Sequence, residues 1–212
     1  MQQEIEIKLD IPQDVTTNTV LRKLERIVQD RGFTIVSPKV VERDFQYYDT
    51  PNLDIYRRGE TLRRVGGFDP NKSRVAFRYD FKIGPIDDRY EANHWTSEQL
   101  DDTAILKQFD LERFYARIFP SASANTQHHK MKLERRGTII EATLDYFNII
   151  GGAGFRELEL ELEHGDISGL TILSEPLQSE LGLERTHKQK YSRVIESIPK
   201  YKTLIGNCPP KL

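Results

Sequence analysis

Carboxylates alternate with aliphatic residues along two short segments of this chain. The first segment is residues 4–9 (EIEIKL), and the second is residues 157–163 (ELELELE). In a β-strand the side chains of residues i and i+2 point to the same face, so each segment predicts a strand with one aliphatic face and one acidic face. Glutamate has a low β-propensity, and like charges that face each other across strands destabilise a sheet. The acidic faces therefore need a reason beyond strand formation.

Two interpretations account for these faces. One is a solvated outer surface of an amphipathic sheet, since charged side chains usually mark an exposed face. The other is an interior acidic site that holds metal ions. The presence of two such strands, with a matching set of cations elsewhere in the chain, favours the interior site. Ligands that are all oxygen atoms suit Mg²⁺ or Mn²⁺, so we expect one of these ions as the cofactor.

The composition narrows the class of protein. Charged residues make up 30% of the 212 residues, but the formal net charge is only −2, which argues against a general nucleic-acid binder. The chain has no apolar run as long as the roughly 18 residues of a membrane span and no signal-peptide pattern, so we expect a cytoplasmic protein. The single cysteine, Cys208, excludes an internal disulfide. We expect one domain over residues 1–200 and a C-terminal tail over residues 201–212.

Local patterns predict many strands and few helices. Strands are expected at residues 3–10, 36–48, 61–65, 74–83, 89–95, 129–135, 138–147 and 155–163. A hairpin loop is expected at residues 66–71. Helices are expected at residues 20–28, 96–118, 187–198 and, interrupted by Pro176, from Ser168 onward, with a short turn or helix at residues 53–58. About eight strands joined by short turns favour an antiparallel barrel over β-α-β winding.

Several segments, taken in order, resemble the motifs of one family. Glu4-x-Glu6-x-Lys8 is similar to the N-terminal signature of the CYTH superfamily, also called triphosphate tunnel metalloenzymes. The later matches are residues 47–51 (YYDTP), 53–63 (LDIYRRGETLR), 82–85 (KIGP), 89–91 (RYE), 141–145 (EATLD), 157–166 (ELELELEHGD) and 188–193 (KQKYSR). The ordered set spans almost the whole chain.

This resemblance implies an α+β, mainly β fold: an eight-stranded antiparallel β-barrel tunnel with flanking helices. In this family the tunnel binds a triphosphate with one or two divalent cations. Its activities include hydrolysis of inorganic, thiamine and RNA 5′-triphosphates and class IV adenylate cyclisation. The leading hypothesis is divalent-metal-dependent hydrolysis of a triphosphate compound. The alternatives are an adenylate cyclase that makes cAMP from ATP and a non-catalytic module that binds polyphosphate or a nucleotide.

The resemblance also implies roles for individual residues. The expected metal ligands are the carboxylates of Glu4, Glu6, Asp145, Glu157, Glu159 and Glu161. The expected substrate-binding residues are Lys8, Arg63, Arg78, Lys82, Arg89, Arg135, Lys188 and Lys190. The residues expected to act in catalysis are Glu4, Glu6, Lys8, Arg63 and Lys82. A triphosphate carries about four negative charges and needs several such cations. The expected partner is a small-molecule triphosphate, without a membrane or a stable nucleic-acid complex, and the protein is expected to be a monomer or a homodimer.

Three positions depart from the family pattern. Val65 stands where the family usually has a second inward-facing arginine, so one phosphate ligand is either missing or supplied by Arg78. Asp80 replaces a usual threonine and adds an inward-facing carboxylate. Either Arg135 or Arg136 corresponds to the arginine that the family has in this strand. These changes leave room for an altered substrate or a weakly active protein.

Two other groups of residues are given structural roles. His128 and His129 are adjacent, so a strand would place their rings on opposite faces and they would not chelate one ion. Trp95 and Tyr90 are expected in the core or at the rim of the barrel rather than as a platform that stacks on a base. The sequence has no Walker loop, no nucleophile elbow and no Cys/His zinc spacing.

Overall fold

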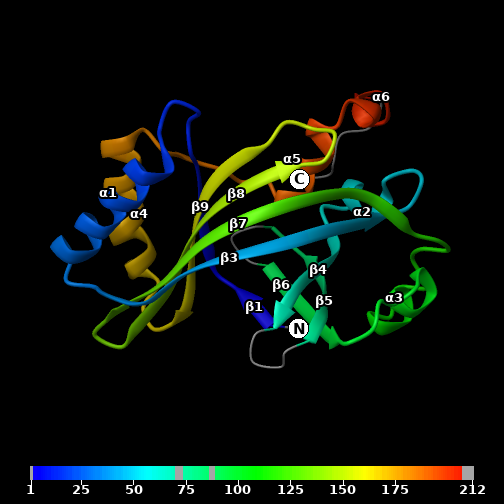
Figure 1. The fold of residues 1–212 in the computed structure, drawn as a ribbon, viewed down its shortest axis with the longest axis horizontal. Helices are drawn as coiled ribbons and strands as arrows, with labels where there is room; N and C mark the ends of the chain where they lie inside the picture. Colours follow the sequence, from blue (N-terminus) through cyan, green and yellow to red (C-terminus); the bar gives the residue numbers. More distant parts are fainter. Residues whose placement is uncertain (1, 70–73, 86–88, 207–212) are drawn as a thin grey trace.

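The computed structural model describes residues 2–69, 74–85 and 89–206 and has a strongly curved antiparallel sheet with helices on its outside (Figure 1). In the described part of the chain, the strands are β1 (Gln2–Glu4), β2 (Glu6–Asp10), β3 (Thr34–Asp49), β4 (Thr61–Asp69), β5 (Arg74–Ile83), β6 (Arg89–Thr96), β7 (Phe119–Arg135), β8 (Thr138–Ile149), β9 (Phe155–His164) and β10 (Glu184–Arg185). Their order in the sheet is β1-β6-β5-β4-β3-β7-β8-β9-β2-β10.

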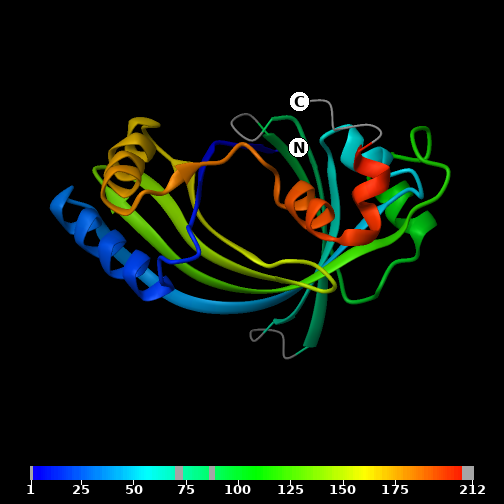
Figure 2. The same cartoon turned by 90° about the horizontal axis from the view of Figure 1, so that it is seen from above.

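The N-terminal segment joins the two ends of this sheet. β1 pairs with β6 and β2 pairs with β9, and Ile5 alone separates β1 from β2. The hydrogen-bonded ladder is therefore not an unbroken ring, but the chain itself passes from one end of the sheet to the other. With β1 and β2 counted as one strand and the short β10 set aside, eight strands surround the interior (Figure 2). The antiparallel tunnel fold expected from the sequence is confirmed in this form.

The aliphatic faces of β2 and β9 point outward and lie under two helices. Leu9 and Leu160 are fully buried and belong to one apolar cluster with Leu24 of α1 (Thr17–Asp30) and Leu173 of α4 (Ser168–Leu181). Burying each such side chain contributes about 1.5–3 kcal/mol. The acidic faces are thereby turned into the barrel, where the Glu157 side chain is fully buried. The solvated-surface interpretation is therefore wrong.

A second apolar cluster fixes the helices at the other end of the barrel, where α2 (Asp54–Arg57), α3 (Asp102–Gln108) and α5 (Lys190–Ser197) lie. Tyr47 of β3 stacks on Tyr191 of α5 with 5.0 Å between ring centroids. The buried Asp49 accepts hydrogen bonds from the Tyr191 hydroxyl at 2.8 Å and from the backbone N–H of Ile55 at 2.9 Å. This carboxylate therefore ties α2 and α5 to the end of β3. A short turn (Pro199–Tyr201) and α6 (Lys202–Gly206) follow α5.

Several expected elements differ from the structure. The helix expected over residues 96–118 is wrong in extent, because β6 runs to Thr96 and α3 begins only after Asp101. The Asp101 side chain caps α3 by accepting a hydrogen bond from the Ala104 N–H at 2.8 Å. Asp110, which has a φ of 54°, ends the helical region. The misleading pattern arises because Leu111, Tyr115 and Ile118 pack into the same cluster from turns rather than from a helix. β4 continues to Asp69, beyond the expected start of the hairpin loop.

Other parts of the expected pattern are confirmed or lie outside the described chain. The first helix is confirmed, with the Thr16 side chain accepting from the Thr19 N–H at 3.2 Å. The described helices include none with the length and apolar character needed to cross a membrane. Residues 70–73 of the expected hairpin loop and residues 207–212 of the expected tail, including Cys208, lie outside the described residues.

Candidate active site

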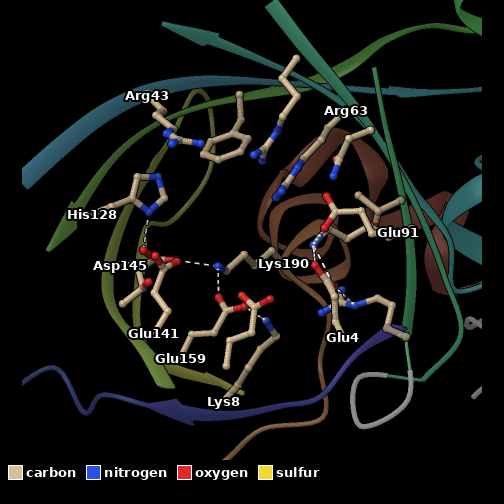
Figure 3. Close-up of a pocket in the computed structure, with 18 of the residues that line it drawn as sticks. Glu4, Lys8, Arg43, Arg63, Glu91, His128, Glu141, Asp145, Glu159 and Lys190 are labelled. Carbon is tan, nitrogen blue, oxygen red and sulfur yellow. Dashed lines mark hydrogen bonds and ion pairs between the residues drawn. The ribbon is translucent and has the colours of Figure 1, made fainter. Parts of the chain in front are cut away.

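A cavity of about 260 Å³ lies inside the barrel and is lined almost entirely by charged side chains (Figure 3). Its cations are Lys8, Arg43, Arg63, Arg78, Lys82, Arg89, Lys130 and Lys190. Its carboxylates are Glu4, Glu91, Glu141, Asp145, Glu159 and Glu161. A barrel of eight strands normally fills its interior with apolar side chains. Filling it with ionised groups costs stability unless they are paired or bind a ligand.

Three carboxylates gather on one wall of the cavity. Asp145 of β8 lies opposite Glu157 of β9 in the strand register, and Glu159 follows on the same face. One oxygen atom of each residue lies within 4.8 Å of the others. All three are expected metal ligands, and the strand register explains why they meet.

Lys190 enters this carboxylate group from α5. Its Nζ atom lies 2.5 Å from Asp145 Oδ2 and 3.3 Å from Glu157 Oε1, and it also pairs with Glu159. Burial alone would lower the pKa of Lys190, but the charges of Asp145, Glu159 and Glu157 raise it well above its ordinary value. Lys190 therefore stays protonated and acts as the counterion of the three carboxylates.

The carboxylate group fits a divalent cation. Asp145 and Glu157 are buried, Glu159 is half-buried, and the group offers only oxygen ligands, as Mg²⁺ and Mn²⁺ prefer. Glu157 Oε1 is buried and accepts no hydrogen bond from a described residue, and its one ion-pair contact there is with the Lys190 ammonium group at 3.3 Å. Asp145 is further held by a hydrogen bond with His128, as metal-ligating carboxylates usually are held by an outer partner. A cation bound here would take over the role of the Lys190 ammonium group.

The expected ligands Glu4 and Glu6, on the N-terminal strands, are paired with cations, and Glu4 lines the cavity. Lys8 Nζ bridges Glu6 Oε2 and Glu159 Oε1, both at 2.8 Å. Lys82 Nζ lies 2.9 Å from Glu4 Oε1, and Arg89 pairs with both Glu4 and Glu6. Three of the six expected ligands therefore form one group. Glu6 lies beside Glu159 of that group, with Lys8 between them, whereas Glu4 is paired with Lys82 and Arg89.

Glu161 lies between these two groups and forms no ion pair with any described residue. It lines the cavity and lies opposite Glu6 on β2 and Glu141 on β8. Burial, followed by the charges of Glu159 and Glu4, raises the pKa of Glu161 to about 7. This carboxyl group therefore changes its protonation state near neutral pH.

The opposite wall has an excess of positive charge. Arg63 Nε lies 2.8 Å from Asp80 Oδ2, and Arg78 Nη2 lies 2.9 Å from the same oxygen. Arg43 also lines the cavity, but its guanidinium group forms no ion pair within the described part of the chain. Burial and the charges of Arg78 and Arg63 lower the pKa of Arg43. The guanidinium groups of Arg43, Arg63 and Arg78, with one carboxylate among them, can attract an anion, and we call these three side chains the arginine wall.

The predicted site residues lack several residues that line the cavity, among them Arg43, Lys130 and His128. Arg43 lies two residues before the buried Phe45 on β3, so its strand position was a usable signal for an inward side chain. His128 was given no metal role, and the structure places it inside the barrel, hydrogen-bonded to Asp145 and, at 2.6 Å, to Thr126 Oγ1. Burial lowers the pKa of His128 despite Asp145, so the ring is neutral at pH 7. His129 is half-buried and lies on the other face of β7, as the alternation predicted.

Two expected substrate-binding residues do not reach the cavity. The Arg135 guanidinium lies over the Phe33 ring at 5.5 Å, near the end of β7. Lys188 precedes α5, and its largely exposed side chain pairs with Glu196 at 2.7 Å. The remaining expected cations, from Lys8 to Lys190, all line the cavity. The motif match placed Arg135 on the right strand but not at a cavity-lining position, and it placed Lys188 in a helix that begins only at Lys190.

Known structures share this fold. The sequence matches no protein-family model and no curated protein. HpAC1 from Hippeastrum, described as a candidate adenylyl cyclase with a dominant triphosphatase activity, matches with a TM-score of 0.58 and 16% identity over 90% of this chain and 94% of its own. The PH1819 protein from Pyrococcus horikoshii matches with a TM-score of 0.56 and 20% identity over 91% and 98%. The chain shares the fold of these proteins, an antiparallel tunnel as the resemblance to the CYTH superfamily implied.

A third structure with the same fold is a candidate adenylate cyclase from Bacillus halodurans, with a TM-score of 0.53 and 13% identity over 91% of this chain and 98% of that chain. Nearly the full length of each of these tunnel proteins is matched. At such low identity the comparison establishes the fold, and the chemistry must be argued from the residues of this chain.

The departure at Val65 gives a first prediction. Val65 is 5% exposed, and it lies opposite Phe45 on β3 and Arg78 on β5. Because Arg78 already supplies a guanidinium at this level, Val65→Arg should add a crowded like charge. We expect weaker binding of tripolyphosphate, measured by isothermal titration with Ca²⁺, and a loss of about 1–3 kcal/mol in stability. Val40→Arg, at a 56% exposed position of β3, is the control. Tighter binding by Val65→Arg would show that a ligand is missing.

The pKa of Glu161 gives a second prediction. Because the folded-state pKa of about 7 lies above the ordinary value of 4.5, the metal-free protein should lose stability as the pH rises through this interval. Glu161→Gln removes the ionisable group and with it this pH-dependent loss of stability. In EDTA its thermal midpoint should match the wild type near pH 5 and exceed it at pH 8. Glu163→Gln, at the exposed end of β9, should show no such divergence. The same difference at both pH values would contradict the assignment.

Proposed function

We propose that this chain, acting as a single domain over residues 1–200, hydrolyses a triphosphate compound in its tunnel with the help of Mg²⁺ or Mn²⁺. The observation that supports this most is one cavity with the arginine wall on one side and, across from it, Asp145 and Glu159 of the three-carboxylate group (Figure 3). Phosphoryl transfer needs mainly positioning of the phosphates and stabilisation of their charge. A cavity with these two walls offers both.

The residues divide between two tasks. Asp145, Glu157 and Glu159 would hold the divalent cation. When bound, such an ion neutralises charge on the phosphoryl oxygens and makes water a better nucleophile. The arginine wall binds and orients the phosphate chain, and Lys8 and Lys82 lie where they can exchange a carboxylate partner for a phosphate oxygen.

Glu161 fits the role of proton acceptor. A general base works best when its pKa lies near the working pH, and the pKa of Glu161 is about 7. It lines the cavity without a described ion-pair partner, so its carboxylate is free to approach a water molecule or a metal ligand sphere. This role does not exclude the metal-binding role that the sequence suggested.

Hydrolysis is favoured over cyclisation by one comparison. HpAC1, which shares the fold, is described as having a dominant triphosphatase activity although it was a candidate adenylyl cyclase. Both reactions need the same phosphate-binding wall, so the geometry of the arginine wall alone does not distinguish them. Detection of cAMP after incubation with ATP would favour the cyclase alternative.

A substitution in the carboxylate group tests the proposal. Glu159→Gln should lower phosphate release from tripolyphosphate by about 100-fold or more, because it removes a ligand of the catalytic ion. The assay measures released phosphate with Mg²⁺ and with Mn²⁺. Glu163→Gln, on the same strand but exposed, should remain within about two-fold of wild type, as surface substitutions usually do.

Two results would overturn this function. Wild-type protein that binds tripolyphosphate but releases no phosphate with Mg²⁺, Mn²⁺ or Ca²⁺ would be a binding module. A Glu159→Gln variant with activity close to wild type would remove the carboxylate group from the mechanism. Circular dichroism of the variant establishes that it is folded before its activity is compared.

A further inference from the structure

Trp95 lies at the open end of the row of side chains that lines the tunnel. On β6, Glu91 lies opposite Lys82 and Trp95 lies opposite Arg78, so both belong to the inward-facing set of that strand. Exposure along this row rises from 4% at Arg89 to 60% at Trp95. The sequence left Trp95 in the core or at the rim, and the structure places it at the rim.

The indole ring is connected to the arginine wall by one side chain. The Arg78 guanidinium carbon lies 5.7 Å from the centroid of the Trp95 ring, within the range of a cation–π contact. The same guanidinium group pairs with Asp80, which also holds Arg63. A phosphate chain bound at the arginine wall therefore ends close to the Trp95 ring.

This position distinguishes Trp95 from the other exposed aromatic side chains. Single exposed apolar residues are common and need no special explanation. Tyr146 is 52% exposed but follows Asp145, which points inward, so Tyr146 lies on the outer face of β8. Phe114 is 47% exposed in the segment after α3, away from the cavity lining. Tyr90 is 42% exposed and alternates with the inward-facing Arg89 and Glu91, so it lies on the outer face of β6. Among these four residues, Trp95 alone has a cation–π contact with a residue of the cavity.

We propose that Trp95 stacks on a planar heteroaromatic ring carried by the triphosphate, so that the preferred substrate is an organic triphosphate of the nucleoside type rather than inorganic tripolyphosphate. This inference rests on the proposed function, because it takes the arginine wall as the phosphate site. Base stacking on an aromatic side chain is strong and tolerant of the identity of the base. Arg78 orients the indole and leaves most of its surface open to the ring of the substrate.

The composition of the chain makes a direct test possible. Trp95 is the single tryptophan of the 212 residues, so the intrinsic tryptophan fluorescence reports on this ring alone. ATP, CTP and tripolyphosphate are titrated into the wild-type protein with Ca²⁺ in place of Mg²⁺ to slow turnover. Stacking predicts strong quenching by ATP, weaker quenching by CTP and little change with tripolyphosphate.

Substitution separates stacking from phosphate binding. By isothermal titration, Trp95→Leu should bind ATP about ten-fold more weakly, while its affinity for tripolyphosphate stays within about two-fold of wild type. Trp95→Phe should keep most of the ATP affinity, because it retains an aromatic face. Tyr146→Leu removes an exposed aromatic side chain from the outer face and should change neither affinity.

The outcomes distinguish this inference from the proposed function. If tripolyphosphate binds but neither nucleotide quenches the fluorescence, or if Trp95→Leu binds ATP as well as wild type does, the stacking role is overturned and the proposed function stands. If wild-type protein binds neither tripolyphosphate nor a nucleotide, the proposed function itself fails. If Trp95→Leu does not fold, the quenching measured on the wild type decides the question.

Discussion

The pairing of buried charges inside the barrel is the constraint on which the rest of this structure depends. An ionised group can be buried only if a partner of opposite charge or a hydrogen-bonding group replaces its hydration. Lys8 on β2 bridges Glu6 and Glu159, and Lys190 on α5 meets carboxylates from β8 and β9. These cations join elements that are far apart in the sequence. The strand register and the position of α5 must therefore pair the buried charges and also allow the apolar clusters outside the barrel to pack. The aliphatic faces under α1 and α4 supply the apolar burial that the interior lacks.

The same constraint explains how the interior can receive a ligand. The charges in the cavity are not evenly mixed, because the carboxylate group faces the arginine wall. In that wall Arg43 has no described counterion, and the single carboxylate of Asp80 pairs with both Arg63 and Arg78. A metal ion and a triphosphate bring charge of the sign that each wall lacks. Their binding together would replace internal ion pairs with ligand contacts while the total charge in the cavity stays balanced. The cost of burying the charges in the free protein is consistent with a site built for charged ligands.

The sequence predicted the features that follow from the alternation of polar and apolar residues along a β-strand. Alternation gave the inward faces of β2 and β9, and with them Lys8, Glu157 and Glu159, because one face of each strand is wholly aliphatic. On β3 and β7 the polar and apolar residues do not alternate cleanly, so Arg43 and His128 were missed. The break at Ile5, after which Glu4 pairs with cations of β5 and β6, and the register of β8 on β9, which brings Asp145 to Glu157, depend on pairing between distant strands. The overlong helix after Thr96 arose because helical spacing of apolar residues continued through turns that pack on the same core.

The central claim is that the arginine wall binds the phosphate chain, and Arg43 tests it most directly because it makes no ion pair in the described structure. Isothermal titration of tripolyphosphate, with Ca²⁺ present, compares wild type with Arg43→Gln, and thermal unfolding in EDTA compares their stabilities. The account predicts binding about ten-fold weaker, the effect of losing one charge-assisted contact, with a thermal midpoint equal to or above that of wild type. Equal affinity for tripolyphosphate in a folded variant would contradict it.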